Sequence, residues 1–329
     1  MVTTPPSSAA APSDSPKRDR LNDLVTVTGG SVDGEVGNPA FRHVAPRSMP
    51  MPVLISVPHA GRAYPPHVLE QMRDEDLCRL RLEDRYIDKL AVEIARQTRT
   101  GLLVANAPRA MLDLNRAHDD VDWDMIRSGR KRLVRSAPIS RRARSGLGLI
   151  PRRLPGFGEI WREPLAEETL DQRVASIHRP YHDFLALELA RIRDEWGVAL
   201  LIDLHSMPPL RPKSGEARAP EIVLGDRFGM SCHGALISRA FQYLETQRRP
   251  SAHNRPYAGG YVLDRHAAPS KGIHAVQVEV CRSTYLDGNL DQPTTNLAPI
   301  AHMLAGLVRE LGAEAARIGS TGQLRQAAE

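Results

Sequence analysis

The order of hydrophobic and polar positions divides most of the chain into predicted strands and helices. Short continuous aliphatic runs are typical of strands buried on both faces, and strict alternation over 274–281 also predicts a strand. Longer segments repeat apolar residues with the 3.6-residue period of an amphipathic helix. The predicted strands are 52–57, 101–106, 198–206, 221–225 and 274–281, and the predicted helices are 66–98, 165–196, 231–247 and 294–318.

The two ends of the chain lack this periodicity. Residues 1–20 are rich in Ser, Thr, Ala, Pro and charge, a composition typical of disorder, and the following stretch to residue 46 suits a short strand or a loop. We therefore predict a disordered or poorly ordered tail over 1–46, one folded domain over 47–318, and a C-terminal tail over 319–329. Within the domain, the Gly-rich residues 257–262 predict a loop or hairpin.

The predicted strand 198–206 ends in polar side chains that can carry chemistry. Asp203, His205 and Ser206 follow an aliphatic run, and Met207-Pro208-Pro209 then stops the strand. Open α/β sheets place their sites at the carboxyl ends of parallel strands. The alternative is structural, with Asp203 capping the turn and His205 hydrogen-bonded within a loop.

A second histidine occupies the same kind of position on another strand. His59 comes directly after the predicted strand 52–57, where Pro58 ends the strand and Gly61 permits a tight turn. One such histidine is usually structural. Two histidines at the ends of separate buried strands indicate a pair of metal ligands.

A carboxylate ligand would complete this set. Asp84 and Asp88 share a face of the predicted helix 66–98 because they are four residues apart. They either turn toward the two histidines or form a solvated acidic face paired with Arg85 and Lys89. Two histidines, one carboxylate and an open fourth position make a catalytic zinc site.

Further polar residues near strand ends suit substrate binding and proton transfer. Asn115 and Arg116 can hold a carboxylate, because the guanidinium fork binds it bidentately and the amide adds a donor. Glu279 is costly to bury without a partner, and it suits a general base that acts on a metal-activated water. The competing interpretation is that all these residues are scattered surface polars.

A pair of histidines on the predicted helix 165–196 has the spacing of zinc ligands. His178 and His182 are four residues apart, but no Glu follows His178 and Pro180 strains the helix between them. We interpret them as packing residues or as residues that support the site from behind.

Composition narrows the classes of protein that remain. The formal net charge is +5, and residues 127–153 hold ten Lys or Arg and no acid. This basic block predicts a solvated or substrate-facing loop, while its few aromatics argue against nucleic-acid binding. No apolar run reaches the roughly 18–20 residues of a membrane span. Three cysteines without a CxxC pair predict no disulfide framework and a cytoplasmic location.

Several short motifs, taken together and in this order, resemble the N-formylglutamate amidohydrolase family. They span roughly residues 52–310. The motifs are Ile55-Ser56-Val57-Pro58-His59-Ala60-Gly61, Glu83-Asp84-Arg85-Tyr86-Ile87-Asp88, Asp113-Leu114-Asn115-Arg116, Gly146-Leu147-Gly148 with Ile150-Pro151-Arg152, His178-Arg179-Pro180-Tyr181-His182, Asp203-Leu204-His205-Ser206, Gly259-Gly260-Tyr261 and Val276-Gln277-Val278-Glu279.

The resemblance implies an α/β fold, a single three-layer domain with a mixed, mostly parallel sheet of about eight strands between helices. It also implies a distant likeness to zinc carboxypeptidases and aspartoacylase, whose His-x-x-Glu loop supplies two zinc ligands. Here Arg62 stands at the Glu position, so the carboxylate ligand comes from elsewhere. Asp84 is our choice, with Glu83 and Asp88 as alternates, beside His59 and His205.

The function implied is zinc-dependent hydrolysis of N-formyl-L-glutamate to formate and L-glutamate, a reaction that the family links to histidine degradation. Glu279 corresponds to the catalytic base, and Asn115 with Arg116 to the residues that bind the substrate carboxylate. Arg109, Arg265 and Arg282 are further candidates, because this substrate has two carboxylates. One alternative is another N-acyl amino acid or small amide as substrate. The other is a non-enzymatic module that binds anions or nucleic acid through the basic block.

Overall fold

The computed structural model describes residues 23–32, 37–127, 140–212 and 218–326. Eight strands form one sheet in the order β1-β2-β4-β3-β9-β12-β10-β11. The remaining strands form two small separate pairs, β5 (Ile126–Arg127) with β8 (Leu165–Ala166) and β6 (Arg153–Leu154) with β7 (Gly158–Glu159). The strands of the large sheet are β1 (Leu24–Gly29), β2 (Phe41–Pro46), β3 (Val53–Val57), β4 (Gly101–Ala105), β9 (Ala199–Met207), β10 (Ile222–Gly225), β11 (Ser251–His253) and β12 (Ile273–Cys281).

The centre of this sheet is parallel and its flanks are partly antiparallel. Strands β4, β3, β9 and β12 run parallel to one another, and β10 runs parallel to β11. Strands β1 and β2 are antiparallel additions at one side, and β10 is antiparallel to β12. The predicted mixed, mostly parallel sheet is therefore confirmed.

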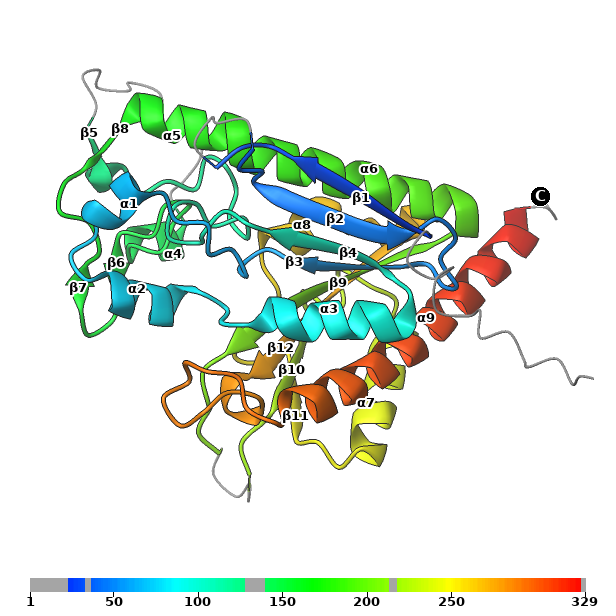
Figure 1. The fold of residues 1–329 in the computed structure, drawn as a ribbon. Helices are drawn as coiled ribbons and strands as arrows, with labels where there is room; N and C mark the ends of the chain where they lie inside the picture. The colour runs from blue at the N-terminus through cyan, green and yellow to red at the C-terminus, as the bar shows by residue number, and fades with distance from the viewer. Residues whose placement is uncertain (1–22, 33–36, 128–139, 213–217, 327–329) are drawn as a thin grey trace, which may run out of the picture.

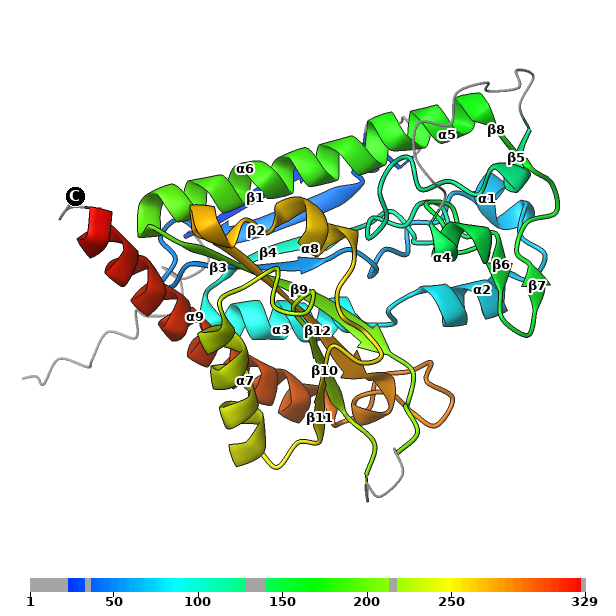
Figure 2. The same cartoon turned by 180° about the vertical axis from the view of Figure 1, so that it is seen from behind.

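Helices cover both faces of the sheet, as the two views in Figures 1 and 2 show. On one side α6 and α8 pack against Leu201 and Ala275, and on the other α3, α7 and α9 pack against Leu200 and Val276. No described helix has the length and apolar character needed to cross a membrane. The helices are α1 (Pro66–Glu70), α2 (Glu75–Leu82), α3 (Ile87–Thr98), α4 (Arg141–Arg144), α5 (Glu167–Arg173), α6 (Arg179–Trp196), α7 (Gly234–Thr246), α8 (Tyr261–His266) and α9 (Leu297–Gln326).

The predicted helix 66–98 is wrong in its continuity. It is divided into α1, α2 and α3, because the side chain of Asp74 caps α2 and Tyr86 adopts a left-handed backbone, with φ of 55°, before α3. Asp84 consequently lies in the turn between α2 and α3 and shares no helix face with Asp88. The apolar face of the pattern is real, but periodicity does not reveal these two interruptions.

The predicted tails are also corrected. Residues 1–22 lie outside the described residues, but β1 and β2 belong to the large sheet, where β2 buries Phe41 and pairs with β4. At the other end α9 continues to Gln326, and Gly319 within it packs closely against Val198. Within the predicted loop 257–262, the helix α8 begins at Tyr261.

The predicted helix 165–196 is largely confirmed. It consists of α5, a π-helical turn over Val174–His178, and α6, and it ends at Gly197, whose φ of 71° suits a helix terminus. Pro180 is tolerated because it lies in the first turn of α6. The π turn over Val174–His178 lies directly before α6, and it is where the helix adjusts to the strain that Pro180 predicts.

Three buried histidines join α6 to α8. His182 Nδ1 lies 2.9 Å from His266 Nε2, and the rings of His178 and His182 are 4.4 Å apart. Burial lowers the pKa of His178 to about 4 and that of His266 to about 3, and it also lowers the pKa of His182. The cluster is therefore neutral near pH 7.

This cluster predicts a loss of stability in mild acid. The unfolded chain binds protons at these histidines near pH 6.5, whereas the folded chain does so only near pH 3–4, so stability falls as pH falls below about 6.5. His266→Gln retains an N–H donor for His182 but does not titrate. Between about pH 4.5 and 6, we expect the free energy of unfolding of this variant to depend less steeply on pH than that of the wild type. The difference in slope is about 1.4 kcal/mol per pH unit, which corresponds to one proton. Urea unfolding across that range measures this slope, and an unchanged slope would contradict the prediction.

Candidate metal centre and catalytic cavity

His59, Asp84 and His205 come together at the carboxyl ends of the central strands. One ligand atom from each residue lies within 4.8 Å of the other two, and all three side chains are buried. His59 follows β3, His205 lies near the end of β9, and Asp84 reaches them from the turn before α3. This group contains the same three residues that we predicted as ligands.

Each histidine is held by its own carboxylate on the side away from Asp84. His59 Nε2 lies 2.6 Å from Asp113 Oδ1, and His205 Nε2 lies 2.9 Å from Asp203 Oδ2. The two Nδ1 atoms face Asp84 Oδ2, at 3.7 Å from His59 and 3.0 Å from His205. Carboxylate–histidine pairs of this kind fix the ring and its tautomer at metal sites.

The donor set fits a divalent metal. His59 Nδ1 is buried and has no hydrogen-bond partner among the described residues. Such an orphaned nitrogen costs free energy unless a cation or another partner engages it. Two imidazole nitrogens and one carboxylate match the ligands of catalytic zinc.

Asp84 is held as a charged carboxylate. It accepts hydrogen bonds from the backbone N–H of Ser206 at 3.1 Å and from the guanidinium of Arg282 at 3.2 Å. Although burial alone would raise its pKa, the hydrogen bond with His205 and the nearby imidazole of His59 hold that pKa well below the usual range. The alternates point elsewhere, because Glu83 pairs with Arg85 and Asp88 with Arg62.

Glu279 lies directly beside His205. The two residues face each other in the parallel register of β12 and β9, so their side chains project from the same face of the sheet. Gln277 donates a hydrogen bond of 2.8 Å to Glu279 Oε1. Burial raises the pKa of Glu279 to about 7, which is suitable for a group that accepts and returns a proton near neutral pH.

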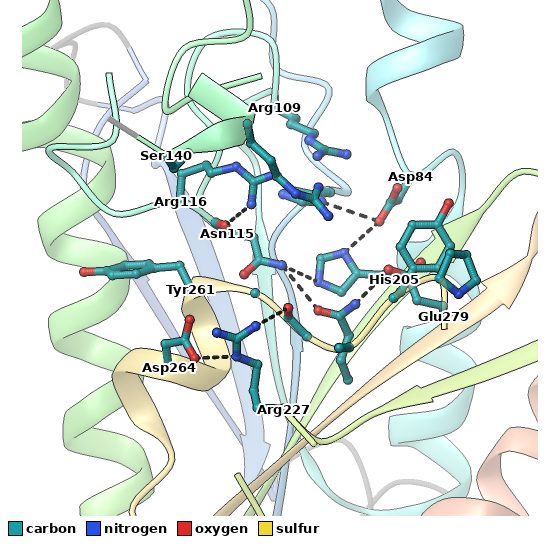
Figure 3. Close-up of a pocket in the computed structure, with 18 of the residues that line it drawn as sticks. Asp84, Arg109, Asn115, Arg116, Ser140, His205, Arg227, Tyr261, Asp264 and Glu279 are labelled. Carbon is teal, nitrogen blue, oxygen red and sulfur yellow. Dashed lines mark hydrogen bonds and ion pairs between the residues drawn. The ribbon is translucent and has the colours of Figure 1, made fainter. Parts of the chain in front are cut away.

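Asn115 is fixed next to this centre by contacts on both sides. Its Nδ2 lies 3.5 Å from His205 Nε2, and its Oδ1 accepts a hydrogen bond of 2.9 Å from the backbone of Val262. A Cβ at Gly260 would approach the Asn115 amide to 2.5 Å, so only glycine fits there. Figure 3 shows Asn115 pointing toward His205.

The loop that carries Asn115 is anchored from behind by the buried histidines. The Nε2 atoms of His178 and His182 donate to the backbone carbonyls of Arg116 and Leu114, at 2.9 and 3.0 Å. Neither histidine belongs to the metal group among the described residues. They therefore support the site from behind, which is one of the two interpretations that their spacing permitted.

The four predicted arginines have different surroundings. Arg116 is buried and makes no ion pair with a described residue, while Arg109 pairs with Asp113. Arg282 donates to Ser206, to Asp84 and to two backbone carbonyls, so it supports Asp84. Arg265 lies outside the cavity lining and pairs with Asp183, because α8 directs it away from the site.

The metal group, Glu279, Asn115 and the three predicted arginines other than Arg265 line one cavity of about 800 Å³. Sequence reasoning assigned no specific role to some of the residues that line this cavity or support it. Asp113 and Asp203 hold the histidines, and each is the first residue of a motif on which the family resemblance rests. Arg227 lines the cavity, but no local pattern distinguishes it from surface arginines. Arg142 also lines the cavity, and it belongs to the basic block that predicts a solvated or substrate-facing loop. Residues 128–139 of the basic block lie outside the described residues.

Comparison with known proteins agrees with this geometry. The N-formylglutamate amidohydrolase family matches residues 51–286. The chain is 32% identical to an N-formylglutamate deformylase of Pseudomonas aeruginosa over 266 residues, covering 79% of this chain and 91% of the relative. It is also 32% identical to an N-formylglutamate deformylase of Pseudomonas putida over 241 residues, covering 72% of this chain and 82% of that protein.

Solved structures show the same likeness. The crystal structure of N-formylglutamate amidohydrolase from Ralstonia eutropha JMP134 superimposes with a TM-score of 0.72 at 25% identity, covering 86% of this chain and 98% of that one. A gene product of Agrobacterium tumefaciens shares the fold, with a TM-score of 0.54 at 17% identity and coverage of 81% and 92%. The extent of the match and the identity to the curated relatives agree with the resemblance of the motifs, and the chain therefore belongs to the N-formylglutamate amidohydrolase family.

Proposed function

We propose that the protein is a metal-dependent amidohydrolase that cleaves N-formyl-L-glutamate to formate and L-glutamate. The observation that carries the proposal is the group His59, Asp84 and His205, in which both imidazoles are held by carboxylates and face the same point. Its membership of the family and the deformylase names of the curated relatives support the substrate.

The metal would be held by His59, Asp84 and His205, and zinc is the ion that this donor set suits best. When bound, it would polarise the amide carbonyl and lower the pKa of water. Asp113 and Asp203 keep the imidazoles oriented for ligation, and Arg282 keeps the carboxylate of Asp84 in place.

Glu279 would act as the general base and then as the general acid. Its pKa of about 7 allows it to take a proton from the attacking water and to give that proton to the leaving amine. The hydrogen bond from Gln277 fixes one carboxylate oxygen, and the parallel register sets the carboxylate beside His205.

Arg116 would bind a substrate carboxylate. Its Nε and one terminal nitrogen donate to the backbone carbonyls of Leu147 and Asn115, which fixes the plane of the guanidinium. Among the described residues its other terminal nitrogen has no hydrogen-bond partner. Asn115 adds an amide donor at the same wall of the cavity.

The volume of the cavity favours a second candidate substrate class. About 800 Å³ accommodates an acyl group larger than formyl, so another N-acyl amino acid is the alternative on the same site. The catalytic groups would then be unchanged.

The first experiment measures metal content together with formate release from N-formyl-L-glutamate, before and after chelation. We expect about one zinc per chain and activity that disappears on chelation and returns with added zinc. Zinc without formate release would favour the second substrate class. Activity in metal-free protein would contradict the proposal.

His205→Ala provides a matched test of the metal site. We expect it to lose most bound metal, because it removes a ligand and leaves Asp203 Oδ2 without the imidazole that it contacts. His302→Ala is the control, since His302 is exposed and hydrogen-bonded to Gln97.

Glu279→Gln should keep the metal and lose turnover. Without a carboxylate to accept the proton, we expect kcat to fall by about 10²- to 10⁴-fold while metal content stays unchanged. Glu310→Gln, at a surface ion pair with Arg239, is the control. Wild-type turnover in the Glu279 variant would exclude it as the base.

Asp203→Asn should weaken metal binding without removing a ligand. We expect the metal affinity to fall about 10- to 100-fold, as is typical for loss of a carboxylate behind a ligating histidine. Competition with a chromogenic chelator measures this affinity. Asp88→Asn is the control, because Asp88 pairs with Arg62 outside the cavity lining, and equal affinities in the two variants would contradict the supporting role of Asp203.

A further inference from the structure

A strained turn stands at the wall of the cavity, directly after β10. Arg227 and Phe228 have φ angles of 54° and 56°, and Gly229 follows with 87°. Two consecutive non-glycine residues in the left-handed region are unfavourable, and such strain persists where the surrounding structure enforces it, most often at functional sites. The strained backbone therefore points to a functional role for a side chain of this turn.

The turn is held by buried polar contacts. Asp226 is 3% exposed, and its Oδ1 accepts hydrogen bonds from Gly229 N at 3.1 Å and from Asn254 Nδ2 at 2.6 Å. The Asn254 side chain in turn accepts from the backbone N–H of Asp226 at 3.0 Å. The backbone N–H of Arg227 donates to the carbonyl of Ala258 at 2.8 Å.

The side chain of Arg227 enters the cavity and is oriented there. Its Nε lies 2.5 Å from Asp264 Oδ1, and one terminal nitrogen lies 3.4 Å from the carbonyl of Gly259. The other terminal nitrogen has no hydrogen-bond partner in the part of the chain that the structure describes. An arginine held through Nε keeps an outer edge of its guanidinium free for an anion.

Two adjacent glycines place Arg227 close to Asn115. A Cβ at Gly259 would lie 3.1 Å from Arg227 Cδ, and a Cβ at Gly260 would lie 2.5 Å from Asn115 Oδ1. Since neighbouring Cα atoms are about 3.8 Å apart, the two side chains lie against consecutive residues of one segment. Asn115 itself is 3.5 Å from His205, so Arg227 is within the reach of a small substrate bound at the centre.

We propose that Arg227 binds the second carboxylate of the substrate and so selects N-formyl amino acids with an acidic side chain. This inference rests on the proposed function. Arg116 and Arg227 lie on opposite sides of Asn115, as Figure 3 shows, and both line the cavity. A substrate with one amide and two carboxylates places one carboxylate on each arginine and its amide between them.

Two of the other predicted arginines, Arg265 and Arg282, do not serve this second position. Arg265, adjacent to Asp264 on α8, pairs with Asp183 of α6 and lies outside the cavity lining. Arg282 uses its three nitrogens on groups of the protein itself. Asp264 therefore orients Arg227, whereas its neighbour on the helix points away.

The test compares formate release from N-formyl-L-glutamate and from N-formyl-L-glutamine, which has nearly the same shape but lacks the second carboxylate. We expect wild-type kcat/KM to favour the glutamate substrate by about 10- to 100-fold, the range for a hydrogen-bonded charged group. Arg227→Met should reduce this preference to about one, mainly through a higher KM for the glutamate substrate.

Two further variants separate recognition from folding. Arg227→Asn removes the guanidinium but keeps a residue that tolerates the left-handed backbone, and Asp264→Asn keeps Arg227 but removes its ion pair. We expect the first to abolish the preference and the second to reduce it. Arg239→Met is the control, because Arg239 is also paired to a carboxylate through Nε, outside the cavity lining, and should keep the full preference.

The outcomes that overturn the inference are distinct from failure of the proposed function. A preference retained in Arg227→Asn, or an equal loss of kcat on both substrates, would overturn the role of Arg227. Equal activity of the wild type on both substrates would do the same. No formate from either substrate would overturn the proposed function itself, and the inference with it.

Discussion

Burial of several carboxylates around two imidazoles is the constraint on which the site depends. Asp84, Asp113 and Asp203 are each at most 2% exposed, and Glu279 lies next to them. Buried charges of one sign are costly unless cations or hydrogen bonds compensate them. Arg109 compensates Asp113, Arg282 compensates Asp84, and His205 lies between Asp84 and Asp203. Glu279 makes no ion pair with an arginine among the described residues, and burial raises its pKa to about 7.

The charged residues of the site that lie on β9 and β12 all project from one face of the sheet, so the apolar core on the opposite face is not interrupted. Along β9, Leu200, Ile202 and Leu204 continue the core under α3 and α9, while Asp203 and His205 project to the opposite face. The same alternation places Glu279 beside His205. On the face that α6 covers, Leu201 and Ala275 belong to the apolar core, whereas His205 and Glu279, further along the same strands, line the cavity. The core and the site therefore use the two faces of the same strands.

Much of this arrangement follows from sequence, because strand ends in a parallel sheet meet at one edge. That rule brings His59, His205 and Glu279 together without any knowledge of distances. It does not reveal that Asp84 lies in a turn, since the left-handed backbone of Tyr86 has no signature in the hydrophobic pattern. It also does not show that Arg227 lines the cavity and Arg265 does not, because the direction of the short helix α8 and the turn after β10 are properties of tertiary structure.

The position of β12 has a consequence for how the molecule is assembled. This strand lies between β9 and β10 in the sheet, although it follows both along the chain. During synthesis, β9 and β10 must wait for a partner that is made some 50 residues later than β10, and Glu279 and Arg282 arrive with it. Pairings of such long sequence separation form late, since the entropy of closing the intervening chain opposes them. The nascent protein therefore completes its cavity near the end of synthesis, and partly made chains carry the two histidines on an unfinished sheet.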